Sequence, residues 1–273
     1  MSREKDTFGK AEEHNSRGIE LADKGWLDEA TSEFKKAIAC DPNSSPAWDN
    51  LATVYSDQSK YREALDAYLQ SLRIAPENPT GHYNLACFLQ MHALEFSVSE
   101  FEQTLKIAPD YPDAHLSLGI ALADMGRNDL AMRELKTAVT QDPEDILARN
   151  ELANQFIEIH DYREAIFQLK EVTRIEPEHF ESWLDLGVCY AQKGFYSEAE
   201  KAYARAAALN GNEILVHYNL AALYAQWQRP AEAIAALDRA NAIDKAKVMQ
   251  WLRVDPMFDS LKGLSDFEVF RGN

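Results

Sequence analysis

The sequence predicts an all-α repeat protein built from helix-turn-helix units. Helical patterns end at intervals of 34, 33, 34 and 34 residues, at Pro42, Pro76, Pro109, Pro143 and Pro177. Proline ends a helix because it lacks the backbone N–H and clashes with the preceding turn. Composition agrees, since the 273 residues include only 11 glycines and 10 prolines and 27% are charged. These values are typical of a helical protein, and the period indicates an array of units.

Further positions recur in step with the prolines. The eighth place of every unit holds a small residue: Gly18, Ala52, Ala86, Gly119, Ala153, Gly187 and Ala221. Sixteen residues later a bulky side chain returns in six units: Phe34, Tyr68, Leu135, Leu169, Tyr203 and Leu237. One helix pair would leave its outer faces bare, so the units must stack on one another.

We place the units in order along the chain. Residues 1–10 are polar, and we expect them to form a flexible N-terminus. The third unit is one residue short in its turn, and the sixth is the most regular, with a turn at Gly194. The seven units, from whose first residues we count places below, span 11–44, 45–78, 79–111, 112–145, 146–179, 180–213 and 214–247.

Residues 248–273 are predicted to cap the array. They begin an eighth first helix with Trp251 and then change character. Asp255 before Pro256 predicts a helix start, and Ser265 with Glu268 matches a capping box. Six apolar residues are expected to cover the open face of the last unit: Met257, Phe258, Leu261, Leu264, Phe267 and Phe270. The alternative is a detachable tail whose aromatic side chains dock elsewhere.

The 34-residue unit resembles the tetratricopeptide repeat (TPR), and the resemblance covers residues 11–247. It implies a right-handed α-solenoid of about seven helix-turn-helix repeats with a C-terminal capping helical segment. In this family the first helix of each repeat lines a concave groove, where extended peptides or partner helices bind. The resemblance therefore implies a protein-interaction scaffold.

Chemistry-bearing residues give no catalytic or metal-binding pattern. His14, His82, His115 and His217 all fall at the fourth place of their units, equivalent to Trp48 and Trp183, so we interpret them as packing residues. The sequence has no HExxH or CxxC spacing, glycine-rich phosphate loop or nucleophile elbow. We expect no enzyme activity, no cofactor and no metal. Three widely spaced cysteines are expected to be buried free thiols: Cys40, Cys87 and Cys189.

The charge and hydropathy of the chain limit its partners. A net charge of −17 argues against nucleic acid, because a binding surface for nucleic acid is basic. A run of about 18 apolar residues is absent, so no membrane insertion is expected. The first ten residues lack the apolar core of a signal peptide, which favours a cytoplasmic location.

The places that the resemblance assigns to the groove are acidic. No lysine or arginine occurs there, which favours a neutral or basic partner and disfavours the carboxylate-terminated tails of chaperones. The alternative is that acidic residues merely favour the first turns of helices. The acidic groove residues are Glu12, Asp23, Asp49, Asp57, Asp113, Asp124, Glu151, Glu158, Glu181 and Asp185.

Asparagines share the same face. A primary amide both donates and accepts hydrogen bonds, so a row of them can pair with an extended peptide backbone. The alternative is that these asparagines serve packing or capping. The predicted partner-binding residues are Asn50, Asn84, Asn219, Asn150, Asn154, Tyr83, Tyr218, Asp49, Glu151 and Asp185.

The sequence thus predicts a non-enzymatic scaffold or adaptor that binds an extended peptide or partner helix in an acidic, Asn-containing groove. Two alternatives stay open at this point. One is a self-assembling homo-oligomeric structural scaffold, and the other is the recognition subunit of a multi-protein enzyme complex.

Overall fold

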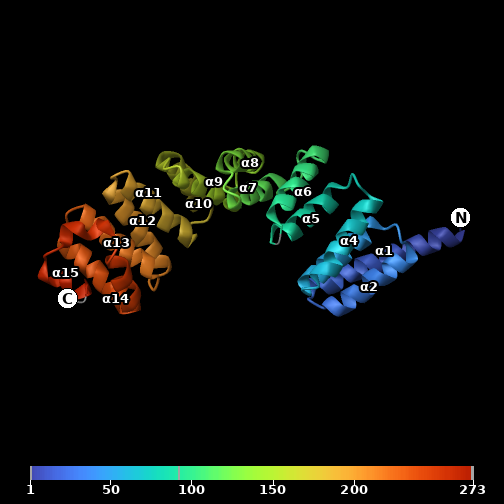
Figure 1. Ribbon diagram of the computed structural model, residues 1–273, viewed down its shortest axis with the longest axis horizontal. Coiled ribbons are helices and arrows are strands. Elements are labelled where there is room, and N and C mark those ends of the chain that lie inside the picture. Colours follow the sequence, from blue (N-terminus) through green and yellow to red (C-terminus); the bar gives the residue numbers. More distant parts are fainter. Residues whose placement is uncertain (1, 92, 272–273) are drawn as a thin grey trace. The chain divides into compact units, whose positions relative to one another are not determined.

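The computed structural model describes residues 2–91 and 93–271 and divides into two compact units, Met1–Ala138 and Val139–Asn273 (Figure 1). Each unit is a stack of helix pairs, and each is described by itself. Within the described residues there is no β-strand, and successive helices pair across short turns. The predicted all-α class is therefore confirmed.

The first unit contains the first three repeats and most of the fourth. Its helices are α1 Ser2–Asp23, α2 Leu27–Cys40, α3 Ser45–Asp57, α4 Tyr61–Ile74, α5 Pro79–Gln90, α6 Leu94–Ile107, α7 Ala114–Asp124 and α8 Asn128–Gln141. The last three residues of α8 lie beyond Ala138 and belong to the second unit. Helix α1 begins at Ser2 rather than near Ala11. Residues 2–10 contain no proline, so the helix can extend through them, although Gly9 disfavours it slightly.

The second unit contains the last three repeats and the C-terminal segment. Its helices are α9 Ile146–Glu158, α10 Tyr162–Ile175, α11 Phe180–Gln192, α12 Tyr196–Leu209, α13 Ile214–Gln226, α14 Pro230–Leu252, the 3₁₀ helix η1 Pro256–Leu261 and α15 Ser265–Arg271.

The turn inside a repeat has one recurring conformation. In six repeats the residue at the fifteenth place has a left-handed backbone conformation, with φ between 59° and 75°. These residues are Gly25, Ser59, Gly126, His160, Gly194 and Gln228. Glycine adopts this conformation without strain, whereas the other residues do so at a cost. The turn predicted at Gly194 lies at this place.

The two helices of a repeat pack through the eighth and twenty-fourth places. A Cβ atom added to Gly18 would lie 2.5 Å from the ring of Phe34, and one added to Gly119 would lie 2.7 Å from Leu135. An added Cβ on Gly187 would clash with the ring of Tyr203. The small residues therefore make room for the bulky ones, which are buried.

Helix α14 contains the boundary between the seventh repeat and the segment that follows it. Asp244 has the extended conformation φ −150°, ψ 92°, which closely matches Asn210 at the end of α12. The carboxylate of Asp244 then accepts a hydrogen bond from the backbone N–H of Lys247. Asp244 thus ends one helix and caps the next, which contains Trp251.

The C-terminal segment covers α13 and α14. The Asp255 side chain caps η1 by accepting from the N–H of Met257, as predicted. The Glu268 carboxylate accepts a hydrogen bond from the backbone N–H of Gly263. Four of the six predicted covering residues are buried in one cluster with α13 and α14: Phe258, Leu261, Phe267 and Phe270. The other two are 40% exposed: Met257 and Leu264.

The cysteines are free thiols. Cys189 is buried, and Cys40 and Cys87 are half-buried. Burial raises the pKa of the Cys189 thiol to about 12, so this side chain is protonated and unreactive at neutral pH.

Candidate functional site

Two pockets of the same design open where consecutive first helices lie side by side, on what we call the first-helix face. The Asn84 pocket, between α3 and α5, has a volume of about 230 Å³. The Asn219 pocket, between α11 and α13, has a volume of about 60 Å³. The first is lined by Thr53, Ser56, Asp57, Tyr68, Asn84, Cys87, Phe88 and Met91. The second is lined at the same places by Val188, Ala191, Gln192, Tyr203, Asn219, Ala222, Leu223 and Gln226, and also by Met257.

The asparagines at the sixth place differ in their hydrogen bonds. The Asn84 amide donates to the Asp49 carboxylate over 2.5 Å, and the Asn50 amide donates to the side chain of Asn15 over 3.1 Å. Both bonds join neighbouring first helices, so these two amides serve packing in part. The Asn219 amide forms no hydrogen bond with any described residue, and its polar atoms are available to a ligand.

Asp49 is a buried carboxylate beside the Asn84 pocket. Its side chain is 5% exposed, and only one of its two oxygens has a hydrogen-bond partner. Burial raises the pKa of Asp49 to about 6, although the hydrogen bond from Asn84 lowers it. Asp49 therefore does not reach the surface, and its role is to accept the hydrogen bond that holds the Asn84 amide.

Asp185 occupies the sixth place of the sixth repeat and is half-buried. It forms no hydrogen bond with any residue that the structure describes. Burial, together with the nearby Glu181 carboxylate, raises the pKa of Asp185 to about 6, although His179 lowers it. A cation placed beside Asp185 would stabilise its charged carboxylate and offset the cost of burying that charge.

The asparagines of α9 have separate environments. The Asn150 amide oxygen accepts from the Ser182 hydroxyl over 2.8 Å, so Asn150 links α9 to α11. Asn154 is exposed, and Glu151 is half-buried on the same helix. Only Asn154 of the two asparagines presents its whole amide to solvent.

The two predicted tyrosines are less accessible than the sequence suggested. Tyr83 is half-buried against Phe101 and Tyr111, and its hydroxyl lies 3.2 Å from that of Ser117. Tyr218 is 6% exposed, and its hydroxyl donates to Asp255 over 2.9 Å. The prediction that Tyr218 offers contact area is wrong in this structure, because the C-terminal segment covers it.

Two tyrosines that were predicted only as recurring bulky residues line the pockets, one in each. Tyr68 and Tyr203 occupy the twenty-fourth place of the second and sixth repeats, where the other repeats have phenylalanine or leucine. Tyr68 also places its hydroxyl 3.1 Å from that of Thr53. The sequence did distinguish these residues, since only the second and sixth repeats have tyrosine at this place.

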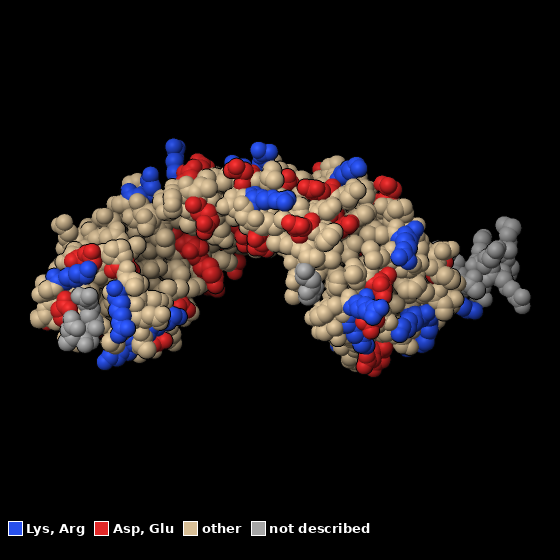
Figure 2. All heavy atoms as spheres, in the orientation of Figure 1, with Lys and Arg blue, Asp and Glu red and all other residues tan. Residues whose placement is uncertain are grey.

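Acidic side chains gather over the part of the second unit that contains α9 and α11 (Figure 2). Glu158 and Glu181 are exposed there, with Glu151 and Asp185 half-buried on the same helices. Helices α9 and α11 therefore present negative charge, and α11 also contributes to the Asn219 pocket.

The fourth place of the repeats has a structural role, as predicted for its histidines. In six repeats, a side-chain nitrogen of the residue at the fourth place forms a hydrogen bond with the backbone carbonyl oxygen of the residue six positions earlier. The distances lie between 2.7 and 3.2 Å, and the residues are Trp48, His82, His115, Arg149, Trp183 and His217. Each bond joins a first helix to the preceding loop. In the described part of the chain no cluster of three or more His, Cys, Asp or Glu side chains could hold a metal ion.

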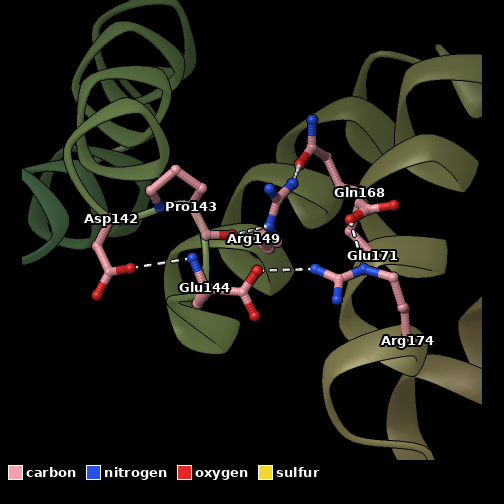
Figure 3. A network of polar contacts seen from close by, with 7 residues as sticks. All are labelled: Asp142, Pro143, Glu144, Arg149, Gln168, Glu171 and Arg174. Atoms are coloured by element: carbon pink, nitrogen blue, oxygen red, sulfur yellow. Dashed lines mark hydrogen bonds and ion pairs between the residues drawn. The ribbon is translucent and has the colours of Figure 1, made fainter.

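Arg149 shows how the fourth place pairs with the second helix (Figure 3). This buried guanidinium donates to the carbonyl of Pro143 over 2.7 Å and to the amide oxygen of Gln168 over 2.6 Å. The equivalent partners in three other repeats are carboxylates: Glu33, Glu100 and Glu134. Arg149 is therefore a buried charge with uncharged acceptors.

Gln168→Glu is expected to raise the free energy of unfolding of the second unit by about 1 kcal/mol, because a charge-assisted hydrogen bond replaces a neutral acceptor. Chemical denaturation at neutral pH measures the change. Gln103→Glu, on the exposed surface of α6, is the control and should change stability by less than about 0.5 kcal/mol. A loss of stability in Gln168→Glu would show that burying the second charge outweighs the pairing.

None of the described helices combines the length and apolar character needed to cross a membrane.

Comparison with protein families gives tetratricopeptide repeat matches along most of the chain. The description "Tetratricopeptide repeat" matches residues 33–66, 97–154, 150–214 and 215–247, and "TPR repeat" matches 52–91.

The chain is similar to segments of larger proteins. It is 24% identical over 246 residues to Superkiller protein 3 of Schizosaccharomyces pombe, covering 89% of this chain and 16% of that protein. It is 23% identical over 230 residues to the anaphase-promoting complex subunit cut9 of the same yeast, covering 82% of this chain and 29% of cut9. The chain thus spans less than a third of either relative.

Solved structures share the fold. That of pilF from Pseudomonas aeruginosa has a TM-score of 0.68 at 15% identity and covers 77% of this chain and 96% of its own. That of YrrB, described as a TPR protein with an unusual peptide-binding site, has a TM-score of 0.60 at 23% identity and covers 67% and 95%. Proteins with this repeat are generally non-enzymatic scaffolds for protein–protein interaction. The repeat period, the stacked helix pairs and these matches together show that the chain belongs to the tetratricopeptide repeat family.

Proposed function

We propose that the chain is a non-enzymatic scaffold that binds an extended segment of a partner protein on its first-helix face. The observation that carries this proposal is the pair of equivalent pockets at Asn84 and Asn219. Both have an asparagine on one side and a tyrosine on the other, Tyr68 in the first and Tyr203 in the second. Each pocket is a binding site within its own compact unit, where a side chain of a partner segment would enter and the asparagine amide would pair with the backbone of that segment.

The charges favour a neutral or basic partner. The chain has a net charge of −17, and Asp185 has a raised pKa and no hydrogen-bond partner among the described residues. A lysine or arginine of the partner beside Asp185 and Glu181 would stabilise both carboxylates. Such binding would weaken as the salt concentration rises.

Asn219→Ala tests the proposal. A partner that copurifies with the chain from its native cell is identified first, and the affinity of its binding segment is then measured by titration calorimetry. We expect a loss of about tenfold, because removing a hydrogen-bonding amide costs about 1–1.5 kcal/mol. Asn84→Ala should lower the affinity as well, but it also removes the partner of Asp49.

Asn212→Ala is the matched control, since Asn212 is exposed in the loop between α12 and α13 and lines neither pocket. The control should bind with the affinity of the unchanged protein. Equal affinities for Asn219→Ala, Asn84→Ala and the control would refute the proposed site.

A second candidate function is a subunit of a larger assembly, including an enzyme complex. The observation that favours it is the similarity of 82% of the chain to a segment of an anaphase-promoting complex subunit. Copurification with an enzyme activity would support this candidate. Self-assembly into a homo-oligomer is a further possibility that light scattering of the purified chain would test.

A further inference from the structure

A second pair of equivalent pockets lies away from the first-helix face, between two consecutive second helices and the first helix that they share. The Trp183 pocket is formed by α10, α11 and α12 and has a volume of about 320 Å³. The Trp48 pocket is formed by α2, α3 and α4 and has a volume of about 500 Å³. Both volumes fall in the range typical of ligand pockets, about 300–1,000 Å³.

The pockets occur in the two repeats that have tryptophan at the fourth place and alanine at the twenty-third. Alanine at that place is Ala67 in one repeat and Ala202 in the other. In the first, third, fourth and fifth repeats a hydrogen-bonded polar pair joins these two places, as Arg149 and Gln168 do in the fifth. The short alanine side chain leaves the space beside the indole open.

The walls of the Trp183 pocket are apolar. Leu186 is 1% exposed, and Trp183 and Tyr190 are half-buried beside it. The indole N–H already donates to the Pro177 carbonyl over 2.9 Å, so the indole offers the pocket its apolar surface. An apolar side chain, preferably aromatic, fits these walls.

The rim of the Trp183 pocket is basic, in a chain of net charge −17. Lys170 and Lys201 are exposed and form no ion pair with any residue of the described ranges, whereas Arg174 is paired with Glu144 and Glu171. Glu198 is the one carboxylate that lines the pocket. The rim therefore has two lysines free to meet carboxylates of a partner.

The Trp48 pocket has the same walls and a different rim. At the place of Lys201 it has Asp66, and its lysine, Lys35, lies 5.6 Å from the ring of Tyr55. Because the walls are shared, the Trp48 pocket is also expected to bind an apolar side chain of a partner. Because Asp66 replaces Lys201, the residues that flank this side chain are expected to differ in charge.

We propose that the Trp183 pocket binds a large apolar side chain of a partner protein that is flanked by carboxylates. The apolar side chain would lie against Trp183, Leu186 and Tyr190, and the flanking carboxylates would pair with Lys170 and Lys201. This site is independent of the Asn84 and Asn219 pockets, so the same chain could hold two partners.

A synthetic peptide tests the proposal with the full chain. The probe is the acetylated, amidated peptide Gly-Glu-Glu-Phe-Glu-Asp-Gly, titrated into protein that contains ¹⁵N-labelled tryptophan. The indole N–H resonance of Trp183, assigned with Trp183→Phe, should shift in a saturable manner. Lys201→Asp, which copies Asp66, should weaken binding about fivefold or more, since it removes one charge pair and adds repulsion.

Two peptide controls separate the apolar anchor from the charge. The peptide with lysine in place of each acidic residue, and the peptide with alanine in place of phenylalanine, should each shift the Trp183 resonance much less than the probe. The Trp48 resonance serves as the control within the chain and should respond less than that of Trp183. Absence of a saturable shift at Trp183, an equal response to the lysine peptide, or unchanged affinity in Lys201→Asp would overturn the proposal.

Discussion

Phe258→Ala is expected to lower the free energy of unfolding of the second unit by about 3–5 kcal/mol, the usual cost of truncating a buried phenylalanine. Phe258 is 1% exposed. Its ring lies 5.2 Å from the ring of Tyr218 and 6.1 Å from that of Phe267, so the truncation leaves a cavity between the C-terminal segment and α13. Denaturation with guanidinium chloride measures the loss.

Met257→Ala is the matched control, because Met257 belongs to the same 3₁₀ helix and is 40% exposed. It should lower stability by less than about 1 kcal/mol. If Phe258→Ala were as mild as its control, the segment would be the detachable tail that the sequence also allowed.

Asp49→Asn is expected to stabilise the first unit by up to about 3 kcal/mol at pH 8 and to change little at pH 4. The pKa of Asp49 is raised from 3.8 to about 6 in the folded protein, so folding favours the protonated carboxyl. Its stabilising contribution is present below pH 3.8 and is lost as the pH rises through 6, at about 1.4 kcal/mol for each pKa unit. Asparagine stays uncharged and can still accept the hydrogen bond from Asn84.

Urea denaturation at several pH values measures this effect. Asp57→Asn, on the same helix and exposed, is the control and should show no comparable gain at pH 8. A gain in Asp49→Asn that is equal at pH 4 and pH 8 would contradict the account of Asp49 as a carboxylate whose charging opposes folding.

The helix ends before the prolines could be predicted from the sequence because they depend on a local signal. Helices α2, α4, α6, α8 and α10 each end two residues before a proline. The start of α1 at Ser2 was not predicted, since no repeat signal extends before Ala11. Asp244 shows the reverse case, in which a helix boundary is kept although the usual proline is replaced by lysine.

The candidate site was predictable in part. Asn84 and Asn219 both lie at pockets, as their shared place indicated. The bond between Asn84 and Asp49 joins residues 35 positions apart and follows from stacking, which the sequence of one repeat does not display. Tyr218 adjoins Asn219 in the chain, but the helical step of about 100° directs it towards the C-terminal segment.

Site-specific photo-crosslinking tests the proposed binding face most directly. Benzoylphenylalanine is placed at Met91, which lines the Asn84 pocket and is 81% exposed, or at Phe96 on α6, which is 68% exposed and lines neither pocket of the first-helix face. Each variant is irradiated in complex with the copurified partner. We predict a crosslink to the partner from position 91 and none from position 96. Crosslinking from position 96 alone would contradict binding on the first-helix face.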